Sequence, residues 1–320
     1  MKTNVRAISL SECVDMLLAV DSVAVATHIR PDGDTVGGSV ALCKILTALG
    51  KDARLLLADD LPDRLAFLTE GVALAEGVEG RHVITCDVAS PAQLGELYDR
   101  VGEVYMSVDH HRVSTPFAPH YTLPDLSSAG EVVLGIASEL CRRGLLTLTK
   151  DIAYPLYAAI SSDTGGFVFS SATAPTYRAA ATLIETGIDF SDINHRLFHS
   201  KSREQIRAEG LVASRLVSDG NIAYAIISRR DREGLSLKSE HFDTAIDVVR
   251  SLIGVEISFT VKELDDGGYR VSLRSNGFDV ARVAASFGGG GHVRASGCTV
   301  ISETPEEAAA LVLGAIKSRL

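Results

Sequence analysis

The sequence has few cysteines and no long apolar run. Its five cysteines are scattered over 320 residues without a CxxC pair, which argues against a disulfide framework and a zinc–thiolate site. No apolar stretch reaches the roughly 18 residues that a membrane-spanning helix requires. The N-terminal residues also lack the apolar core of a signal peptide. These absences predict a reduced, cytoplasmic protein that does not bind a membrane.

An excess of positive charge is also missing. The 31 basic and 41 acidic residues leave a formal net charge of −10. Proteins that hold long nucleic acids usually present a basic surface, because neutralising phosphates supplies most of their affinity. We therefore expect no long DNA as a partner. A nucleotide substrate should be short, and metal ions should supply much of the positive charge, although net charge does not exclude a local basic patch.

Length and apolar content indicate two domains with ordinary hydrophobic cores. Short apolar runs, typical of buried parallel strands, alternate with helix-like segments in the first half. The strand candidates are 23–27, 53–58, 82–88 and 104–108, and the helical candidates are 35–49, 62–68, 91–100 and 131–143. This alternation predicts the α/β class, with a doubly wound parallel sheet.

The second half has a different pattern. Residues 151–187 look helical with one interruption, and the charged, periodic stretch 194–216 predicts a connecting helix. From about residue 221, strand-like segments surround a helix-like stretch at 242–252. We therefore predict an N-terminal catalytic domain over 1–190, a helical linker over 191–220, and a smaller α/β domain with a mixed sheet over 221–320.

Acidic residues and histidines follow the predicted strands. His28, Asp32 and Asp34 lie on one tight loop after the first strand, where sheets of this class bind ligands. One imidazole and two carboxylates suit a cation site, although an Asp-rich turn stabilised by backbone hydrogen bonds is the simpler alternative. Asp87 ends another strand, and an acid after a buried run is costly unless it is paired or metal-bound. A helix cap is the alternative for Asp87.

Two further acidic motifs follow. Asp109-His110-His111 ends the strand at 104–108, and its histidines can ligate metal or transfer protons, unless the triplet is a surface cluster. Asp163 follows a helix-like segment, where a capping or turn role is the alternative. Converging carboxylates repel one another without a cation. Two divalent ions would balance them, could clamp a phosphoryl group and could activate a water.

The order of these motifs resembles the DHH phosphoesterase superfamily. HxxPDxD, a strand-end Asp, the Asp-His-His triplet and a DTGxF segment all occur in the family's order. The later run GGGGH resembles the DHH-associated domain. Length and layout are most similar to the nanoRNase/pAp phosphatase group, whose members degrade short RNAs from the 5′ end and remove the 3′-phosphate of pAp. Some members hydrolyse cyclic-di-AMP or pApA.

The resemblance also implies roles for residues. One metal would be held by His28, Asp32 and Asp87, and the second by Asp34, Asp87, His110 and Asp163. Asp109 would support the cluster, and His111 would face the scissile phosphate. The mixed ligands favour Mn²⁺, with Mg²⁺, Co²⁺ or Fe²⁺ as alternatives. A homodimer is the assembly that the resemblance favours.

Four consecutive glycines precede His292 in the second domain. Glycine exposes backbone N–H groups that can cradle a phosphate, so we expect an anion-binding loop rather than a flexible connector. The predicted substrate-binding residues are Gly289, Gly290, Gly291, His292 and Arg274, with Arg294 as a weaker candidate.

The chain departs from the family pattern at Ser114, Val168 and Ser171, and these departures bear on substrate preference. The leading hypothesis is hydrolysis of short oligoribonucleotides, pAp-type nucleotides or cyclic-dinucleotide products. A pyrophosphatase or polyphosphatase with the same metal site is one alternative. A non-catalytic nucleotide-binding regulator is another.

Overall fold

The computed structural model describes residues 5–242, 244–265 and 267–320. The chain forms two compact units, one ending at Ser200 and the other beginning at Lys201. Among the described residues, every helix is too short or too polar to cross a bilayer.

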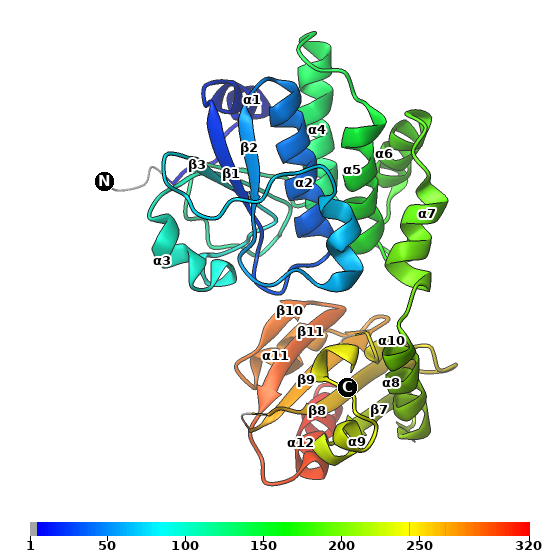
Figure 1. Cartoon of the computed structure of the whole chain (residues 1–320). Coiled ribbons are helices and arrows are strands. Elements are labelled where there is room, and N and C mark those ends of the chain that lie inside the picture. The colour runs from blue at the N-terminus through cyan, green and yellow to red at the C-terminus, as the bar shows by residue number, and fades with distance from the viewer. Residues whose placement is uncertain (1–4, 243, 266) are drawn as a thin grey trace. The chain divides into compact units, whose positions relative to one another are not determined.

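The first unit is built on a five-stranded sheet (Figure 1). Its strand order is β2-β1-β3-β4-β5, and all pairs are parallel. The strands are β1 Ser22–Ala26, β2 Asp52–Leu56, β3 His82–Cys86, β4 Val104–Asp109 and β5 His120–Thr122. The predicted parallel α/β sheet is confirmed. Because β1 lies between β2 and β3, the winding direction reverses there, and ligands bind at such a reversal.

Helices cover both faces of this sheet. One face carries the main core, built with four helices: α1 Leu10–Leu18, α2 Gly33–Ala48, α4 Ala129–Arg142 and α5 Lys150–Asp163. The opposite face is covered by the 3₁₀ helix η2 Pro91–Leu94 and by α3 Leu97–Val101. A further 3₁₀ helix, η1 Asp63–Thr69, and α6 Ala174–Glu185 lie beside α2 and α5, respectively.

Helices α2 and α5 approach each other closely because α2 carries glycine at the contact. A Cβ on Gly37 would lie 2.5 Å from the carbonyl oxygen of Pro155 in α5, so a larger residue would push the helices apart. This contact holds the start of α2 beside the end of α5. It therefore brings the Asp32–Asp34 loop close to Asp163, which lies far away in sequence.

The second unit contains a six-stranded mixed sheet with the order β10-β11-β9-β8-β7-β6. Its strands are β6 Leu216–Asp219, β7 Ile222–Ile227, β8 Ile257–Glu263, β9 Tyr269–Ser275, β10 Gly290–His292 and β11 Ala295–Val300. Only the β7–β8 pair is parallel in this sheet.

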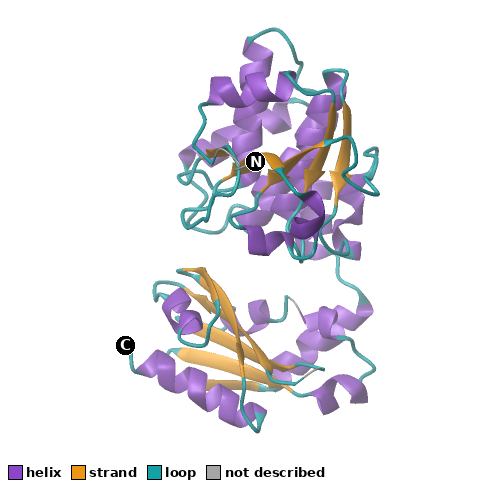
Figure 2. Ribbon diagram, turned by 90° about the vertical axis from the view of Figure 1, so that its left-hand side faces the viewer, coloured by secondary structure: helices purple, strands orange, loops and turns teal. Residues whose placement is uncertain are grey.

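Helices cover both faces of the mixed sheet as well (Figure 2). One core includes α11 Val280–Ala285 and α12 Pro305–Lys317. The other includes α8 Arg203–Ser214, the 3₁₀ helix η4 Ser239–Phe242 and α10 Ile246–Arg250. The short α9 Arg229–Gly234 follows β7. Position 243, inside the helix predicted at 242–252, lies outside the described residues.

Two local predictions were wrong. The stretch 194–216 is not one helix: α7 Phe190–Asn194 runs into a π-helical turn η3 His195–His199, and α8 starts anew after a break. Ser202 and Gln205 form a capping box at that start, which favours a new helix over a continuous one. The glycine run is not wholly a loop either, because Gly290 and Gly291 belong to β10 and pair with β11.

Candidate metal centre

The loop after β1 is held by local hydrogen bonds. Asp32 caps α2, because its Oδ1 accepts from the backbone N–H of Asp34 at 3.0 Å and of Thr35 at 3.1 Å. Thr35 Oγ1 accepts from His28 N at 3.3 Å and donates to the carbonyl of Cys86 at 2.9 Å. Thr35 therefore ties this loop to the end of β3. Asp32 caps α2 through Oδ1, so its Oδ2 can serve as a metal ligand.

Asp87 lies at the centre of the cluster. It follows β3 directly, is buried, and has a φ of 65°, a left-handed conformation that is uncommon outside glycine. Its Oδ2 lies 3.6 Å from His28 Nε2, and its Oδ1 lies 3.4 Å from His110 Nε2. Oδ1 has no hydrogen-bond partner within the described part of the chain. A buried carboxylate oxygen without such a partner calls for a cation.

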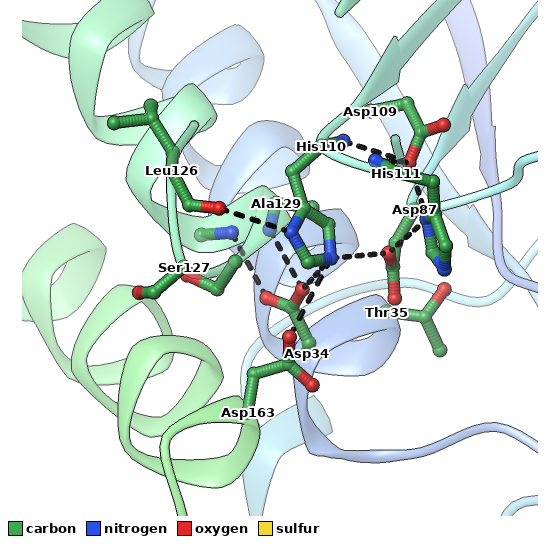
Figure 3. Close-up of polar contacts among 12 residues, drawn as sticks. Asp34, Thr35, Asp87, Asp109, His110, His111, Leu126, Ser127, Ala129 and Asp163 are labelled. Carbon is green, nitrogen blue, oxygen red and sulfur yellow. Dashed lines mark hydrogen bonds and ion pairs between the residues drawn. The ribbon is translucent and has the colours of Figure 1, made fainter. Parts of the chain in front are cut away.

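His110 connects Asp87 with two more carboxylates (Figure 3). Its Nε2 lies 3.6 Å from Asp34 Oδ2 and 3.5 Å from Asp163 Oδ2. These separations exceed the 2.7–3.2 Å of ordinary N–H···O hydrogen bonds. One nitrogen facing three carboxylates at such distances fits donors around a shared cation better than paired hydrogen bonds.

Asp34 lies in the first turn of α2, and its fully buried side chain points at the start of α4. Its Oδ2 accepts from Ala129 N at 2.7 Å, and its Oδ1 accepts from Gly130 N at 2.9 Å. The helix N-terminus favours a negative charge there. Both oxygens of Asp34 are thus held in fixed positions before any metal binds.

Asp109 and His111 form a close pair beside this cluster. His111 Nδ1 lies 2.7 Å from Asp109 Oδ1, and the same oxygen accepts from the backbone N–H groups of His110 and His111 at 2.8 and 3.3 Å. A carboxylate that accepts these bonds requires the proton on Nδ1. His111 therefore has a fixed ring orientation, with Nε2 as its second functional atom.

The pKa values show how strongly the cluster attracts positive charge. Although burial disfavours an imidazolium, the carboxylates of Asp32 and Asp87 raise the pKa of His28 to about 11. Burial acts in the same way on His110, and its carboxylate neighbours raise its pKa to about 11. Burial raises the pKa of Asp163 to about 7, and it raises that of Asp34 well above its usual range. In a metal-free chain, protons thus occupy the place of cations.

The donors fall into three groups, each with ligand atoms within 4.8 Å of one another. These groups are His28/Asp32/Asp87, Asp34/His110/Asp163 and Asp87/His110/His111. All six predicted metal ligands are therefore brought together, and the donor set of carboxylates and imidazoles fits divalent cations. Neither Asp87 nor Asp163 caps a helix in the described part of the chain: Ser90 is the N-cap of η2, and Thr173 is that of α6.

The predicted substrate residues of the second unit lie around β9, β10 and β11. Arg274 is largely buried, donates to the Leu273 carbonyl at 2.9 Å, and lines a small recess with Arg250 and Ser258. Burial lowers the pKa of Arg274 from its usual value. Gly290 to His292 are exposed on the edge strand β10.

Close packing explains why two of these positions are occupied by glycine. A Cβ on Gly289 would lie 2.3 Å from the Gly297 carbonyl oxygen, and one on Gly291 would lie 2.6 Å from that of Ala295. Both positions need glycine because β10 approaches β11 so closely. Gly290, by contrast, faces open space.

Sequence reasoning missed the residues that support the site from behind. The side-chain oxygen Oε1 of Gln93 accepts from Ala89 N at 2.6 Å, and its backbone carbonyl accepts from Ile29 N at 2.7 Å. Gln93 therefore joins the loops after β1 and β3. Glu131 supports the start of α4. The pattern Ser128-x-x-Glu131 predicts a helix cap, but it does not reveal which loops the glutamate holds.

Comparison with known proteins agrees with this geometry. The model of the DHH family N-terminal domain matches residues 22–160, and that of the DHHA1 domain matches residues 219–318. The chain belongs to the DHH family. It is 28% identical to the bifunctional oligoribonuclease and PAP phosphatase NrnA of Thermus thermophilus, over 96% of this chain and 93% of that one.

Two other similarities extend this result. The chain is 25% identical to the cyclic-di-AMP phosphodiesterase GdpP of Geobacillus thermodenitrificans, over 96% of its own length and 49% of that protein. A solved structure of an exopolyphosphatase-related protein from Bacteroides fragilis has a TM-score of 0.88 at 24% identity, covering 97% of this chain and 95% of that one. This likeness shows that the chain shares the fold of that protein over nearly its whole length.

Proposed function

We propose that this DHH-family protein is a metal-dependent phosphoesterase that hydrolyses short oligoribonucleotides from the 5′ end and pAp-type 3′-phosphonucleotides. Cyclic dinucleotides or their linear products are further proposed substrates. The observation that best supports a two-metal reaction is the setting of Asp87, whose two carboxylate oxygens face different histidines and whose Oδ1 is buried without a hydrogen bond.

The proposed metal ligands follow from this shared carboxylate. His28, Asp32 and Asp87 would hold one ion, and Asp34, Asp87, His110 and Asp163 would hold the other. The first set is one of the three donor groups, and the second is the Asp34/His110/Asp163 group with Asp87 added. We propose Mn²⁺, because the ligands combine carboxylate with imidazole, a mixture that an all-oxygen Mg²⁺ site does not use. Two such ions, when bound, stabilise charge on a phosphoryl group and lower the pKa of a water.

His111 is the proposed acid of the reaction. Burial opposes its charged form, but the hydrogen bond to Asp109 raises the pKa of His111 and so favours a ring with a proton on each nitrogen. With Nδ1 bound to Asp109, Nε2 can protonate a leaving oxygen or stabilise its charge. Asp109 thereby acts as a positioning residue.

The exposed ligands suggest where substrate enters. Asp32 and Asp163 have side chains that are 48% and 33% exposed, whereas Asp34 and Asp87 are buried. The phosphate should therefore approach from the side of Asp32 and Asp163. Buried Asp34 and Asp87 then form the floor of the site.

The DHHA1 domain is the proposed substrate-binding part of the chain. Arg274 and His292 would recognise phosphate or base, with backbone N–H groups of Gly289, Gly290 and Gly291 as further donors. Among these glycines, the exposed Gly290 has the most room for a ligand. A homodimer is also part of this proposal, and it rests on the family resemblance.

The relatives support the substrate range. NrnA of Thermus thermophilus is named as an oligoribonuclease and PAP phosphatase, and it aligns with nearly the whole chain, including both domains. GdpP is named as a cyclic-di-AMP phosphodiesterase and aligns over almost all of this chain. Cleavage of short phosphodiesters is the chemistry common to these activities.

The test compares substrates with Mn²⁺ present. The purified full chain is incubated with pAp, pApA, cyclic-di-AMP, a long 5′-labelled RNA or pyrophosphate, and products are separated by chromatography. Rapid turnover of pAp and pApA with little action on long RNA or pyrophosphate supports the proposal. A preference for pyrophosphate would overturn the substrate assignment. An absence of turnover with every substrate would favour a nucleotide-binding regulator instead.

A further inference from the structure

A buried carboxylate without an assigned role lies at the start of α4. Glu131 is only 6% exposed, and its Oε2 accepts from Ser127 N at 2.8 Å, from Ser127 Oγ at 2.5 Å and from Thr176 Oγ1 at 3.2 Å. Its own N–H donates to the capping residue Ser128 at 3.1 Å. Three donors on one oxygen are more than a helix cap requires, because a capping glutamate normally bonds only the N-cap backbone.

The segment that Glu131 holds also contacts two proposed metal ligands. The carbonyl of Leu126 lies 3.4 Å from His110 Nδ1, and the N–H groups of Ala129 and Gly130 donate to Asp34 (Figure 3). Any shift of this segment would move the ring of His110 and the carboxylate of Asp34 together. Glu131 closes the segment by joining Ser127, within it, to the first turn of α4.

Thr176 extends this bracing to a second helix. It is the third residue of α6, and its Oγ1 accepts from Thr173 N at 3.2 Å as well as donating to Glu131. The chain between Asp163 and Thr173 is short, so fixing the start of α6 limits where the end of α5 can lie. Glu131 is thus linked to the surroundings of Asp34, His110 and Asp163.

The other donor group has separate supports. His28 and Asp32 are held through Thr35, and the loops after β1 and β3 are joined by Gln93. Among the described residues, Glu131 bonds to Ser127, Ser128 and Thr176, and none of these lies in those loops. The Glu131 side chain therefore braces the surroundings of Asp34, His110 and Asp163, while the other donor group has supports of its own and is linked to the first by the bond from Asp34 N to Asp32 Oδ1.

We propose that Glu131 is a positioning residue that sets metal affinity at the Asp34/His110/Asp163 half of the centre without touching substrate. The inference rests on the proposed two-metal site. Groups that orient metal ligands typically change metal affinity by about 10- to 100-fold. Loss of Glu131 should therefore lower the binding affinity for one of the two ions by that factor.

The experiment measures Mn²⁺ binding directly. The metal-free full chain is titrated with Mn²⁺, and free ion is quantified by electron paramagnetic resonance. Wild type is compared with Glu131→Ala, with Glu131→Gln, and with Glu139→Ala. Glu139 is the matched control, because it lies on the same helix and, within the described residues, its carboxylate bonds to Arg142 and Arg143 at the C-terminal end of that helix.

The proposal predicts a selective loss. Glu131→Ala should keep one Mn²⁺ site at wild-type affinity and weaken the other by about 10- to 100-fold. Activity should recover when Mn²⁺ is raised, with KM for pAp unchanged. Glu131→Gln should stay close to wild type because its amide oxygen can still accept from Ser127 and Thr176, and Glu139→Ala should match wild type.

Other outcomes would overturn the proposal. Equal weakening of both sites, or unchanged binding at both, would show that Glu131 does not act on one half of the centre. If Glu131→Ala fails to fold, Ser127→Ala, which keeps the backbone donor, should shift the same site in the same direction, and wild-type binding in that variant would refute the idea. A wild-type chain that binds no Mn²⁺ would instead disprove the metal site itself.

Discussion

Asp87 and His110 face each other across 3.4 Å, from Oδ1 to Nε2, although they follow different strands of the sheet. The other oxygen of Asp87 faces His28. The backbone of Asp87 is left-handed, with φ at 65°, which turns the carboxylate between the two rings. Non-glycine residues in this conformation store strain, and such strain is concentrated at functional sites.

Asp87→Asn should remove metal binding with little change to the fold. Asparagine has the size of aspartate and tolerates the left-handed backbone, so the variant removes mainly the negative charge. We expect kcat to fall by more than about 100-fold, which is more than the loss of a residue that only orients a metal ligand typically causes. In wild type, Mn²⁺ at about 100 times its Kd should stabilise the fold by about 2.7 kcal/mol per site.

Thermal unfolding with Mn²⁺ and with a chelator measures this difference. Wild type should unfold at a lower temperature once metal is removed, and Asp87→Asn should unfold at the same temperature in both conditions. Full activity in Asp87→Asn, or an undiminished response to Mn²⁺, would disprove the shared role of Asp87.

Metal binding should release protons. In the metal-free chain the pKa values of His28 and His110 are raised to about 11, so both rings are charged near neutral pH. A ligating histidine must be neutral and a ligating carboxyl ionised, so we expect about two protons to leave the two rings when both ions bind, with further protons from Asp34 and Asp163, whose pKa values are also raised. Titration calorimetry in buffers of different ionisation enthalpy counts these protons, and a buffer-independent heat would contradict the expectation.

The raised pKa values of His28 and His110 also make the folding stability of the metal-free chain depend on pH. A raised pKa means that the charged rings contribute stability fully below about pH 6.5, the usual histidine value, and that this contribution is lost as pH rises toward 11. Metal-free protein should therefore lose stability in that window. Mn²⁺ should protect it increasingly as pH rises, because fewer protons then compete for the site.

His111→Gln should lower the rate without removing metal. A general acid typically contributes about 10²- to 10⁴-fold, so kcat should fall within that range. Asp109→Asn should act in the same direction, because an amide can present a donor to Nδ1 and so disfavour the required tautomer. The control is the number of Mn²⁺ ions bound, measured by the electron paramagnetic resonance titration described above. Loss of an ion in His111→Gln would make His111 a metal ligand instead.

Gly289 and Gly290 provide a matched pair in the DHHA1 domain. Gly289→Ala places a Cβ 2.3 Å from the Gly297 carbonyl oxygen, and such overpacking should cost about 1–3 kcal/mol of stability. Gly290→Ala meets open space, so its stability should stay within about 0.5 kcal/mol of wild type. Chemical denaturation measures both values.

Kinetics with pAp then test the ligand side of the same pair. If Gly290 lies against substrate, Gly290→Ala should raise KM while the folding stability and Mn²⁺ binding stay unchanged. An unchanged KM would remove Gly290 from the proposed phosphate site.

The sequence predicted the parallel sheet well because buried parallel strands are nearly continuous apolar runs, as in 82–86 and 104–108. It missed β5, which has only three residues and pairs at the sheet edge. It also missed the break before α8: residues 199–205 carry no apolar side chain, so only the capping box at Ser202 marks the new start. Short elements and breaks carry too little periodicity to be recognised.

The sequence by itself determined that the acids and histidines after β1, β3 and β4 gather in one place, because the carboxyl ends of parallel strands meet at one edge of a sheet. Asp163 ends helix α5, and only helix packing brings it to the same place. Only the tertiary structure decided how those side chains are oriented. The left-handed turn at Asp87 aims its carboxylate. The two N–H groups that hold Asp34 and the bond from Thr176 to Glu131 join segments that are far apart in the chain. Such contacts depend on close helix packing, as at Gly37, and no local pattern encodes them.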